Sequence, residues 1–341
     1  MKIVCEGLEL SDALLKVSKG TSSKTTNPIL EGIKLSTEED NLVLTATDLE
    51  LSIEKTIRAE VKLEGETVVP GKLFNEYIKK LSNEQIELNL NENNVLSIKY
   101  TDSVGKIQCL NPQEFPQVKK LDYNEYFEIT QNDLRNLINK SIFSVAQEDT
   151  RPILKGCKLE VSDGFVKSIA LDGYRLAVVK KPILKSTGKF NVIVPARSLN
   201  EISKLLEEND NPVKVFIQKN YLMVDIDNTK ITTRLLDGNY IDYNQIIPSN
   251  FTTELILNKQ QLADALERAS LLSKIDKNNL VKFDISDRVM VLSSKSELSC
   301  ECYECVKKIL REIFKAPKRC FFFCQISFVK IELETKTELK I

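Results

Sequence analysis

The chain has 341 residues, with 48 basic and 49 acidic side chains and neither histidine nor tryptophan. The net charge of −1 argues against a protein that binds DNA through bulk positive charge, although a single basic face remains compatible with it. Without histidine, the commonest general acid–base group and the commonest metal ligand are absent, so an enzyme would have to use carboxylates, Lys, Tyr or Cys.

The N-terminal segment gives no sign of export. Residues 1–10 contain Glu6 and Glu9 and have no apolar run before a small-residue cleavage site, so we predict no signal peptide. No stretch approaches the roughly 18 apolar residues that a membrane span needs. We therefore expect a cytoplasmic protein with reduced thiols and no bound cofactor.

The chain repeats itself at a spacing of about 124 residues. Residues 28–35 (PILEGIKL) match residues 152–159 (PILKGCKL). Asp48 and Asp172 follow at the same spacing, each two positions after an alanine. A Val-Pro pair followed by Asn-Glu, at residues 69–76, recurs at 194–201. Three blocks in the same order indicate a repeated structural unit.

The predicted elements follow the same order in both units. Each unit begins with a helix whose apolar residues share one face: Leu10, Ala13, Leu14 and Val17 in the first, and Leu134, Leu137, Ile138 and Val145 in the second. Short strands follow at 42–47 and 165–170, and Pro70 and Pro195 each open a second helix. Alternating apolar residues then predict hairpins, at 86–90 with 95–98 and at 213–217 with 222–226.

A third unit begins near Phe251. Its helix pattern comprises Leu262, Ala265, Leu266, Ala269 and Leu272, and strands are predicted at 281–285 and 289–293. The predicted fold class is therefore α+β, with three units that each contain two helices and two groups of antiparallel strands. We place the domains at residues 1–125, 126–250 and 251–341, with linkers at 111–124 and 248–253.

The composition changes after Glu297. The last 44 residues lack Gly, Asn and Asp, the residues that favour turns, and they hold five of the eight cysteines. We predict that residues 298–341 are a non-homologous tail, as a frameshift would produce, and that the third domain is incomplete. Cys300, Cys302 and Cys305 do not form the paired Cys-x-x-Cys knuckles of metal sites, so we predict incidental thiols and no metal.

The ordered set of motifs resembles one family. Residues 111–116 (NPQEFP), 172–176 (DGYRL) and 236–243 (LDGNYIDY) stand between the paired blocks. Together they resemble the beta subunit of bacterial DNA polymerase III, the DNA sliding clamp, from Met1 to about Glu297. The resemblance implies the DNA clamp fold, a head-to-tail homodimeric ring with helices lining the hole. It also implies a processivity factor whose partners are duplex DNA, the replicative polymerase, the clamp loader and other clamp-binding peptides.

The resemblance also implies which residues face DNA. Lys24 and Arg151 match loops near the hole, whereas Glu148 stands where the family often has a neutral residue. The remaining candidates lie on the predicted inner helices: Lys16, Lys19, Lys72, Lys79, Arg135, Lys140, Arg197 and Arg268. The alternative is that these side chains only solvate helix faces.

A second family site is a groove for partner peptides between units two and three. The matching positions are Leu171, Gly173, Tyr174, Arg175, Leu176, Ile241, Gln245 and Ile246. An apolar groove with one Arg suits a short motif with a Gln and large apolar anchors. Ile241 replaces a frequent Pro and Leu171 a small hydroxyl residue. The alternative is that Leu171, Leu176 and Ile246 are simply core.

Two other functions remain open. An enzyme would use Asp48, Asp172 and Arg175, but the two aspartates occupy the same position in two repeats, which indicates a turn. No Gly-rich phosphate loop or Gly-x-Ser-x-Gly motif supports catalysis. The other candidate is a truncated or frameshifted, monomeric clamp relative that binds partners or DNA without encircling it.

Overall fold

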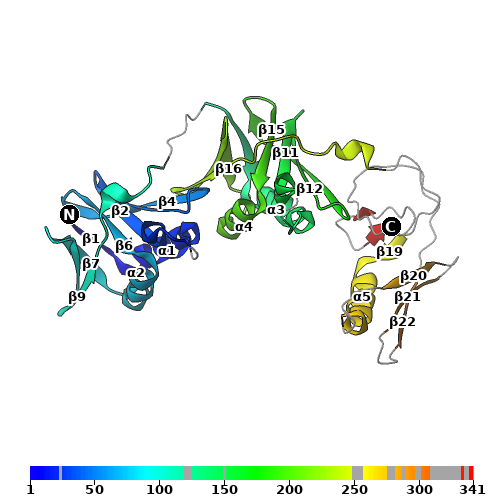
Figure 1. Cartoon of the computed structure of the whole chain (residues 1–341), viewed down its shortest axis with the longest axis horizontal. Helices are drawn as coiled ribbons and strands as arrows, with labels where there is room; N and C mark the ends of the chain where they lie inside the picture. The colour runs from blue at the N-terminus through cyan, green and yellow to red at the C-terminus, as the bar shows by residue number, and fades with distance from the viewer. Residues whose placement is uncertain are drawn as a thin grey trace.

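The three sequence repeats fold as three units placed along an arc (Figure 1). The computed structural model describes residues 1–22, 25–118, 124–148, 151–247, 256–274, 281–285, 289–295, 301–307, 332–333 and 338–340. Most of the predicted tail, residues 298–341, lies outside these ranges. The five helices α1–α5 face the concave side of the arc, and the sheets form its convex side.

The first unit contains two helices and nine strands. In chain order they are β1 (Lys2–Glu6), α1 (Gly7–Val17), β2 (Gly32–Glu38), β3 (Asn41–Thr47), β4 (Leu51–Arg58), β5 (Glu60–Leu63), β6 (Glu66–Pro70), α2 (Gly71–Ile78), β7 (Gln85–Leu90), β8 (Val95–Tyr100) and β9 (Ser103–Gln108), with 3-10 turns at Ser18–Gly20, Pro28–Glu31, Lys79–Leu81 and Pro112–Glu114.

The second unit repeats this order. It comprises β10 (Tyr126–Thr130), α3 (Gln131–Asn139), β11 (Gly156–Ser162), β12 (Phe165–Leu171), β13 (Leu176–Pro182), β14 (Lys185–Ser186), β15 (Phe190–Pro195), α4 (Ala196–Leu205), β16 (Pro212–Gln218), β17 (Tyr221–Ile226) and β18 (Thr229–Arg234), with 3-10 turns η5 (Ile142–Ser144), η6 (Pro152–Lys155) and η7 (Tyr243–Gln245). Pro70 and Pro195 are the N-cap residues of α2 and α4, which confirms the two predicted helix starts.

The described part of the third unit begins in the same way. It contains β19 (Ile256–Asn258), α5 (Lys259–Ser273), β20 (Lys282–Ile285), β21 (Val289–Lys295) and β22 (Glu301–Lys307), with β23 (Glu332–Leu333) and β24 (Glu338–Lys340) near the C-terminus. The Asn258 side chain caps α5 by accepting a hydrogen bond from Gln261 N at 3.1 Å. The helix and the antiparallel strands β20 and β21 match the predicted third repeat, whereas β22 lies in the segment predicted to be a non-homologous tail.

The apolar periodicity identified the core correctly. The four predicted α1 residues, Leu10, Ala13, Leu14 and Val17, are all buried. Leu134, Leu137 and Ile138 are buried on α3, whereas Val145 is buried beyond the end of that helix, which corrects the predicted helix length. Each helix pair therefore covers one face of its sheets with the stripe that its sequence predicts.

The sheets show how the units join. In the first unit one sheet has the order β5-β1-β7-β8-β9, and the second unit has the equivalent order β14-β10-β16-β17-β18. The strand set β4-β3-β2-β6 likewise corresponds to β13-β12-β11-β15. β18 pairs with β4 across the unit boundary, with Thr229, Ile231 and Thr233 opposite Lys55, Ile53 and Leu51. A continuous nine-stranded sheet therefore links the first two units.

Candidate functional site

Most of the predicted basic residues lie on helices of the concave side (Figure 1). Lys72, Lys79, Lys140, Arg197 and Arg268 are exposed, and Lys16, Lys19 and Arg135 are half-buried. Arg151 is exposed at the N-cap of η6. Lys24 lies outside the described residues. The structure thus brings most of the candidate cations to one side of the chain.

Two of these cations already have acidic partners. The Arg135 guanidinium donates to the Glu208 carboxylate at 2.7 Å. Arg197 Nη1, on α4, lies 2.7 Å from Asp48 Oδ2, in the turn between β3 and β4. The Asp48 side chain is nearly buried. Because Asp48 belongs to the first unit and Arg197 to the second, their ion pair joins the two units in addition to the shared sheet. These two arginines are therefore less available to a phosphate than the lysines.

Lys55 is a basic residue of this side that the sequence reading missed. It lies on β4 among Leu51, Ile53 and Ile57, which face the helices, and its Nζ donates to the backbone oxygen of Asp227. Burial lowers the pKa of Lys55, and the charge of Lys16 lowers it further. Lys55 stands two positions from both Ile53 and Ile57 along β4, and side chains at alternate positions of a strand share a face. This spacing could have indicated from the sequence that Lys55 faces the helices.

Lys19 lies close to the second unit. Burial is the main cause of its lowered pKa, Lys204 and Lys16 lower it further, and Glu201 opposes them. Lys204 and Glu201 belong to α4 and form an ion pair of 2.6 Å. Lys16, Lys19, Lys55 and Lys204 therefore gather where the first two units meet, with Glu201 among them.

The predicted turn role of the two aspartates is confirmed. Asp48 Oδ1 accepts hydrogen bonds from Glu50 N and Leu51 N at 3.0 and 2.8 Å. Asp172 Oδ1 accepts from Tyr174 N and Arg175 N at 2.9 and 2.8 Å. Both are capped turns between the third and fourth strands of their repeats, β3 and β4 in the first unit and β12 and β13 in the second.

Arg175 also binds Asp172 through its side chain, with Nε and Nη2 donating to Oδ2 at 2.9 and 2.8 Å. Burial by itself would raise the pKa of Asp172, but the backbone N–H donors of Arg175 and Tyr174, together with the Arg175 guanidinium, lower it. The carboxylate therefore stays charged and holds this turn in place. Gly173 has a φ of +95° here, a conformation that suits glycine.

The groove positions divide into a buried floor and an exposed rim. Leu171 and Leu176 are 3% and 2% exposed and pack with Ile169, Tyr243 and the half-buried Ile241. Their placement agrees with the alternative that they are core, and they would form the floor of the predicted groove. Tyr174 (75% exposed), Arg175 (its side chain 44% exposed), Gln245 and Ile246 (39% exposed) lie on the solvent side.

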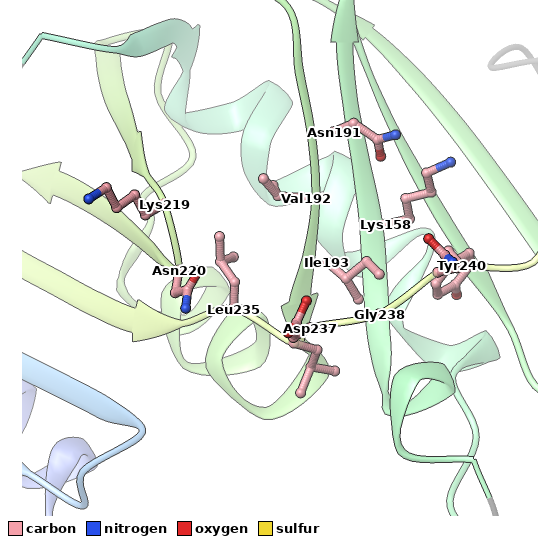
Figure 2. Close-up of a pocket in the computed structure, with 12 residues that line it drawn as sticks. Lys158, Asn191, Val192, Ile193, Lys219, Asn220, Leu235, Asp237, Gly238 and Tyr240 are labelled. Atoms are coloured by element: carbon pink, nitrogen blue, oxygen red, sulfur yellow. The ribbon is translucent and has the colours of Figure 1, made fainter.

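The segment that follows β18 crosses the convex face of the second unit. Leu236 N donates to Ile193 O at 2.9 Å, and Tyr240 Oη donates to Gly156 O and Ile169 O at 3.2 and 3.4 Å. A pocket of about 390 Å³ lies beside this segment (Figure 2), lined by Lys158, Asn191, Asn220, Asn239 and Tyr240 among others. The same segment continues into Ile241, Gln245 and Ile246.

The described part of the chain contains neither a cluster of metal ligands nor a membrane-spanning helix. There, no three His, Cys, Asp or Glu side chains are grouped so that they could hold a metal ion. Cys302 is half-buried and forms no disulfide within the described residues, whereas Cys300, Cys320 and Cys324 lie outside them. None of the described helices is long and apolar enough to cross a membrane.

Three family models match the chain in sequence order. They describe the N-terminal, central and C-terminal domains of the DNA polymerase III beta subunit and match residues 1–119, 128–242 and 244–310. The chain belongs to this family. The match reaches residue 310, so the likeness continues past Glu297, where the resemblance was expected to end, and it includes β22.

Relatives agree over most of their length. The beta sliding clamp of Halalkalibacterium halodurans is 35% identical over 276 residues, covering 78% of this chain and 73% of the relative. That of Staphylococcus aureus is 32% identical over 296 residues, covering 84% and 78%.

Solved structures agree as well. The DNA polymerase sliding clamp from Bacillus subtilis superposes with a TM-score of 0.89, at 26% identity over 100% of this chain and 97% of that one. The DNA polymerase III beta subunit from Pseudomonas aeruginosa gives 0.84, at 28% identity over 90% and 84%. The chain is thus a DNA sliding clamp, a non-catalytic processivity factor, and not an enzyme built on Asp172.

Proposed function

We propose that two copies of the chain close head to tail into a ring around duplex DNA, and that the ring holds the replicative polymerase there through the peptide groove. The main support for this proposal is the pairing of β4 with β18 between units one and two. β9 is the repeat equivalent of β18, and β22 is the equivalent of β4. Both end their sheets in the described part of the chain, so the same pairing is available between two copies.

The register of the β4–β18 pair predicts the contacts of the closing interface. Lys230 of β18 lies opposite Glu54 of β4. By the repeat equivalence, Val104 of β9 takes the place of Lys230, and Tyr303 of β22 that of Glu54. Val104 and Tyr303 are 57% and 61% exposed, which is unusual for large apolar side chains. An ion pair inside the chain would thus become an apolar pair between copies.

The helices beside these strands support the same interface. Leu73 on α2 and Leu271 on α5 are both large exposed apolar residues. They are the repeat equivalents of Ser198 on α4 and of Lys19 in the 3-10 turn after α1, and Lys19 lies close to Glu201 and Lys204 of α4 in the next unit. Closing the ring would bury both leucines, and burial of apolar area is the main driving force of such interfaces.

A ring accounts for the modest basic character of the concave side. Once DNA is encircled, topology prevents its escape, so phosphate contacts can be few and salt-sensitive. Lys16, Lys79 and Lys140 provide such contacts without a base-reading pattern. The same reasoning fits a net charge of −1, because strong attraction would slow sliding.

For partner binding, we assign the apolar floor of Leu171 and Leu176 and the rim of Tyr174 and Arg175 to short peptides. A buried floor with one cation at its edge suits two large apolar anchors and a polar residue. We expect the polymerase and the clamp loader to contain such peptide segments.

The test of ring closure is the mass of the full chain in solution, measured by light scattering at micromolar concentration. A mass near twice 38.8 kDa supports the ring. A mass near 38.8 kDa at every concentration would contradict it and favour the truncated, monomeric clamp relative, which binds partners or DNA without encircling.

A further inference from the structure

The convex face of the sheet β13-β12-β11-β15 changes from apolar to basic along its strands. At one end, Leu171 and Leu176 lie opposite each other, and Ile169 and Val178 form the next pair. Two positions further, Lys167 of β12 lies directly opposite Lys180 of β13. Side chains at alternate positions share a face, so the two lysines lie on the same face as the groove floor.

The pairing of two lysines is unfavourable for folding. Like charges directly opposite on neighbouring strands destabilise a sheet. Among the described residues neither lysine forms an ion pair, although Glu160 of β11 lies directly opposite Lys167. Both Glu160 oxygens are occupied, one by Lys158 at 2.7 Å and the other by the Tyr243 hydroxyl at 3.3 Å. Within the described residues, Lys167 and Lys180 thus have no acidic partner and can pair with an external anion.

The lysine pair is continuous with the groove. Tyr243 packs against Leu171 and Leu176, and its hydroxyl donates to Glu160, next to Lys167 in the same row. Lys158 lies diagonally from Lys167 and also lines the polar pocket of Figure 2. Lys180 is exposed, with its Nζ 3.6 Å from the centre of the Phe165 ring. The apolar floor, the lysine pair and the pocket thus form one continuous surface.

We propose that Lys167 and Lys180 bind acidic residues that flank the apolar anchors of clamp-binding peptides. The inference rests on the proposed groove and names the chemistry of its partners. Lys167 stands four positions before Leu171, which is about 13 Å along a strand. An extended peptide covers this distance in about four residues, so the acidic side chains stand about four residues from an anchor seated on the floor.

The experiment uses the full chain and labelled synthetic peptides in an anisotropy titration at low ionic strength. The acidic peptide carries one Gln, two large apolar anchors and two Glu placed four and five residues away, on either flank in turn. The neutral peptide carries Gln in place of both Glu. The proteins are the wild type, K167Q/K180Q and the control K99Q, which removes one exposed lysine of β8 in the first unit.

In the wild type, the acidic peptide should bind about three- to ten-fold more tightly than the neutral one, because each exposed ion pair contributes ~0.2–1 kcal/mol. K167Q/K180Q should abolish this difference in affinity and leave binding of the neutral peptide unchanged. K99Q should leave the affinities for both peptides unchanged. Added salt should reduce the margin.

Three results would overturn the proposal. If the acidic and neutral peptides bound equally well with the Glu residues on either flank, the proposed acidic contact would be refuted, while the proposed groove would still be supported. Binding of neither peptide would refute the groove itself, and the acidic flank with it. If K167Q/K180Q instead weakened binding of a short linear duplex while the peptide margin remained, the lysines would belong to a nucleic-acid contact.

Discussion

Two residues at equivalent positions of the repeats, Asp48 and Asp172, form different ion pairs. Asp48 and Asp172 cap the same turn, yet Asp172 is paired with Arg175 of its own turn, whereas Asp48 is paired with Arg197 of the next unit. The difference follows from the sequence, since Leu51 stands where the second unit has Arg175. A local ion pair in one repeat is thus replaced by one that joins two units in the other.

At this scale we predict the effect of Arg175→Ala. The affinity for a groove peptide should fall several-fold, because the one cation at the rim is lost. The free energy of unfolding should fall by no more than about 1 kcal/mol, since the ion pair is partly exposed and Asp172 keeps its two backbone donors.

Peptide titration and urea unfolding measure the two quantities separately. Arg58→Ala, at an exposed position at the end of β4, is the control and should leave peptide binding unchanged. Unchanged affinity in Arg175→Ala would remove this residue from the groove.

Among the secondary-structure elements, the edge strands are the basis of the proposed assembly. β4 and β18 show that a pair of edges can join two units, and the shared sheet continues through nine strands. β9 has little alternation of burial along its length, so its sequence gives a weak strand signal. Its function as an edge is visible only beside its equivalent, β18.

Val104→Glu tests this interface. Placing a charge opposite Tyr303 in a closing apolar contact should raise the dimer dissociation constant at least ten-fold, because burial of an unpaired charge is costly. Light scattering over a concentration series measures the change. Leu63→Glu, at an equally exposed residue of β5 on the opposite edge of the same sheet, should leave the mass unchanged. Equal dimerisation of both variants would contradict the β9–β22 pairing.

For the whole molecule, the concave side and the proposed ring would contribute differently to holding DNA. Phosphate contacts weaken as salt rises, whereas a closed ring around circular DNA does not depend on them. Lys16, Lys79 and Lys140 lie on or at the ends of three helices of the concave side (Figure 1).

Replacing these three lysines with Gln should weaken binding to a short linear duplex and reduce the salt slope by up to about three, one for each phosphate contact. Anisotropy titrations between low and moderate salt give that slope. The matched control replaces Lys62, Lys99 and Lys189, which lie on or between strands, with Gln. This variant loses the same amount of positive charge. Equal slopes in both variants would show that net charge, and not the concave side, determines the contact.

The repeated unit, the buried helix faces, the two turns and the family could be predicted from the sequence, because these depend on local periodicity and turn chemistry. Only the folded chain shows that β18 pairs with β4, that Arg197 reaches Asp48, that Lys55 faces the concave side and that Lys167 lies opposite Lys180. Alternation along a strand shows which residues share a face, but not which strand lies beside it. Neighbouring strands and their register are set by packing between distant parts of the chain.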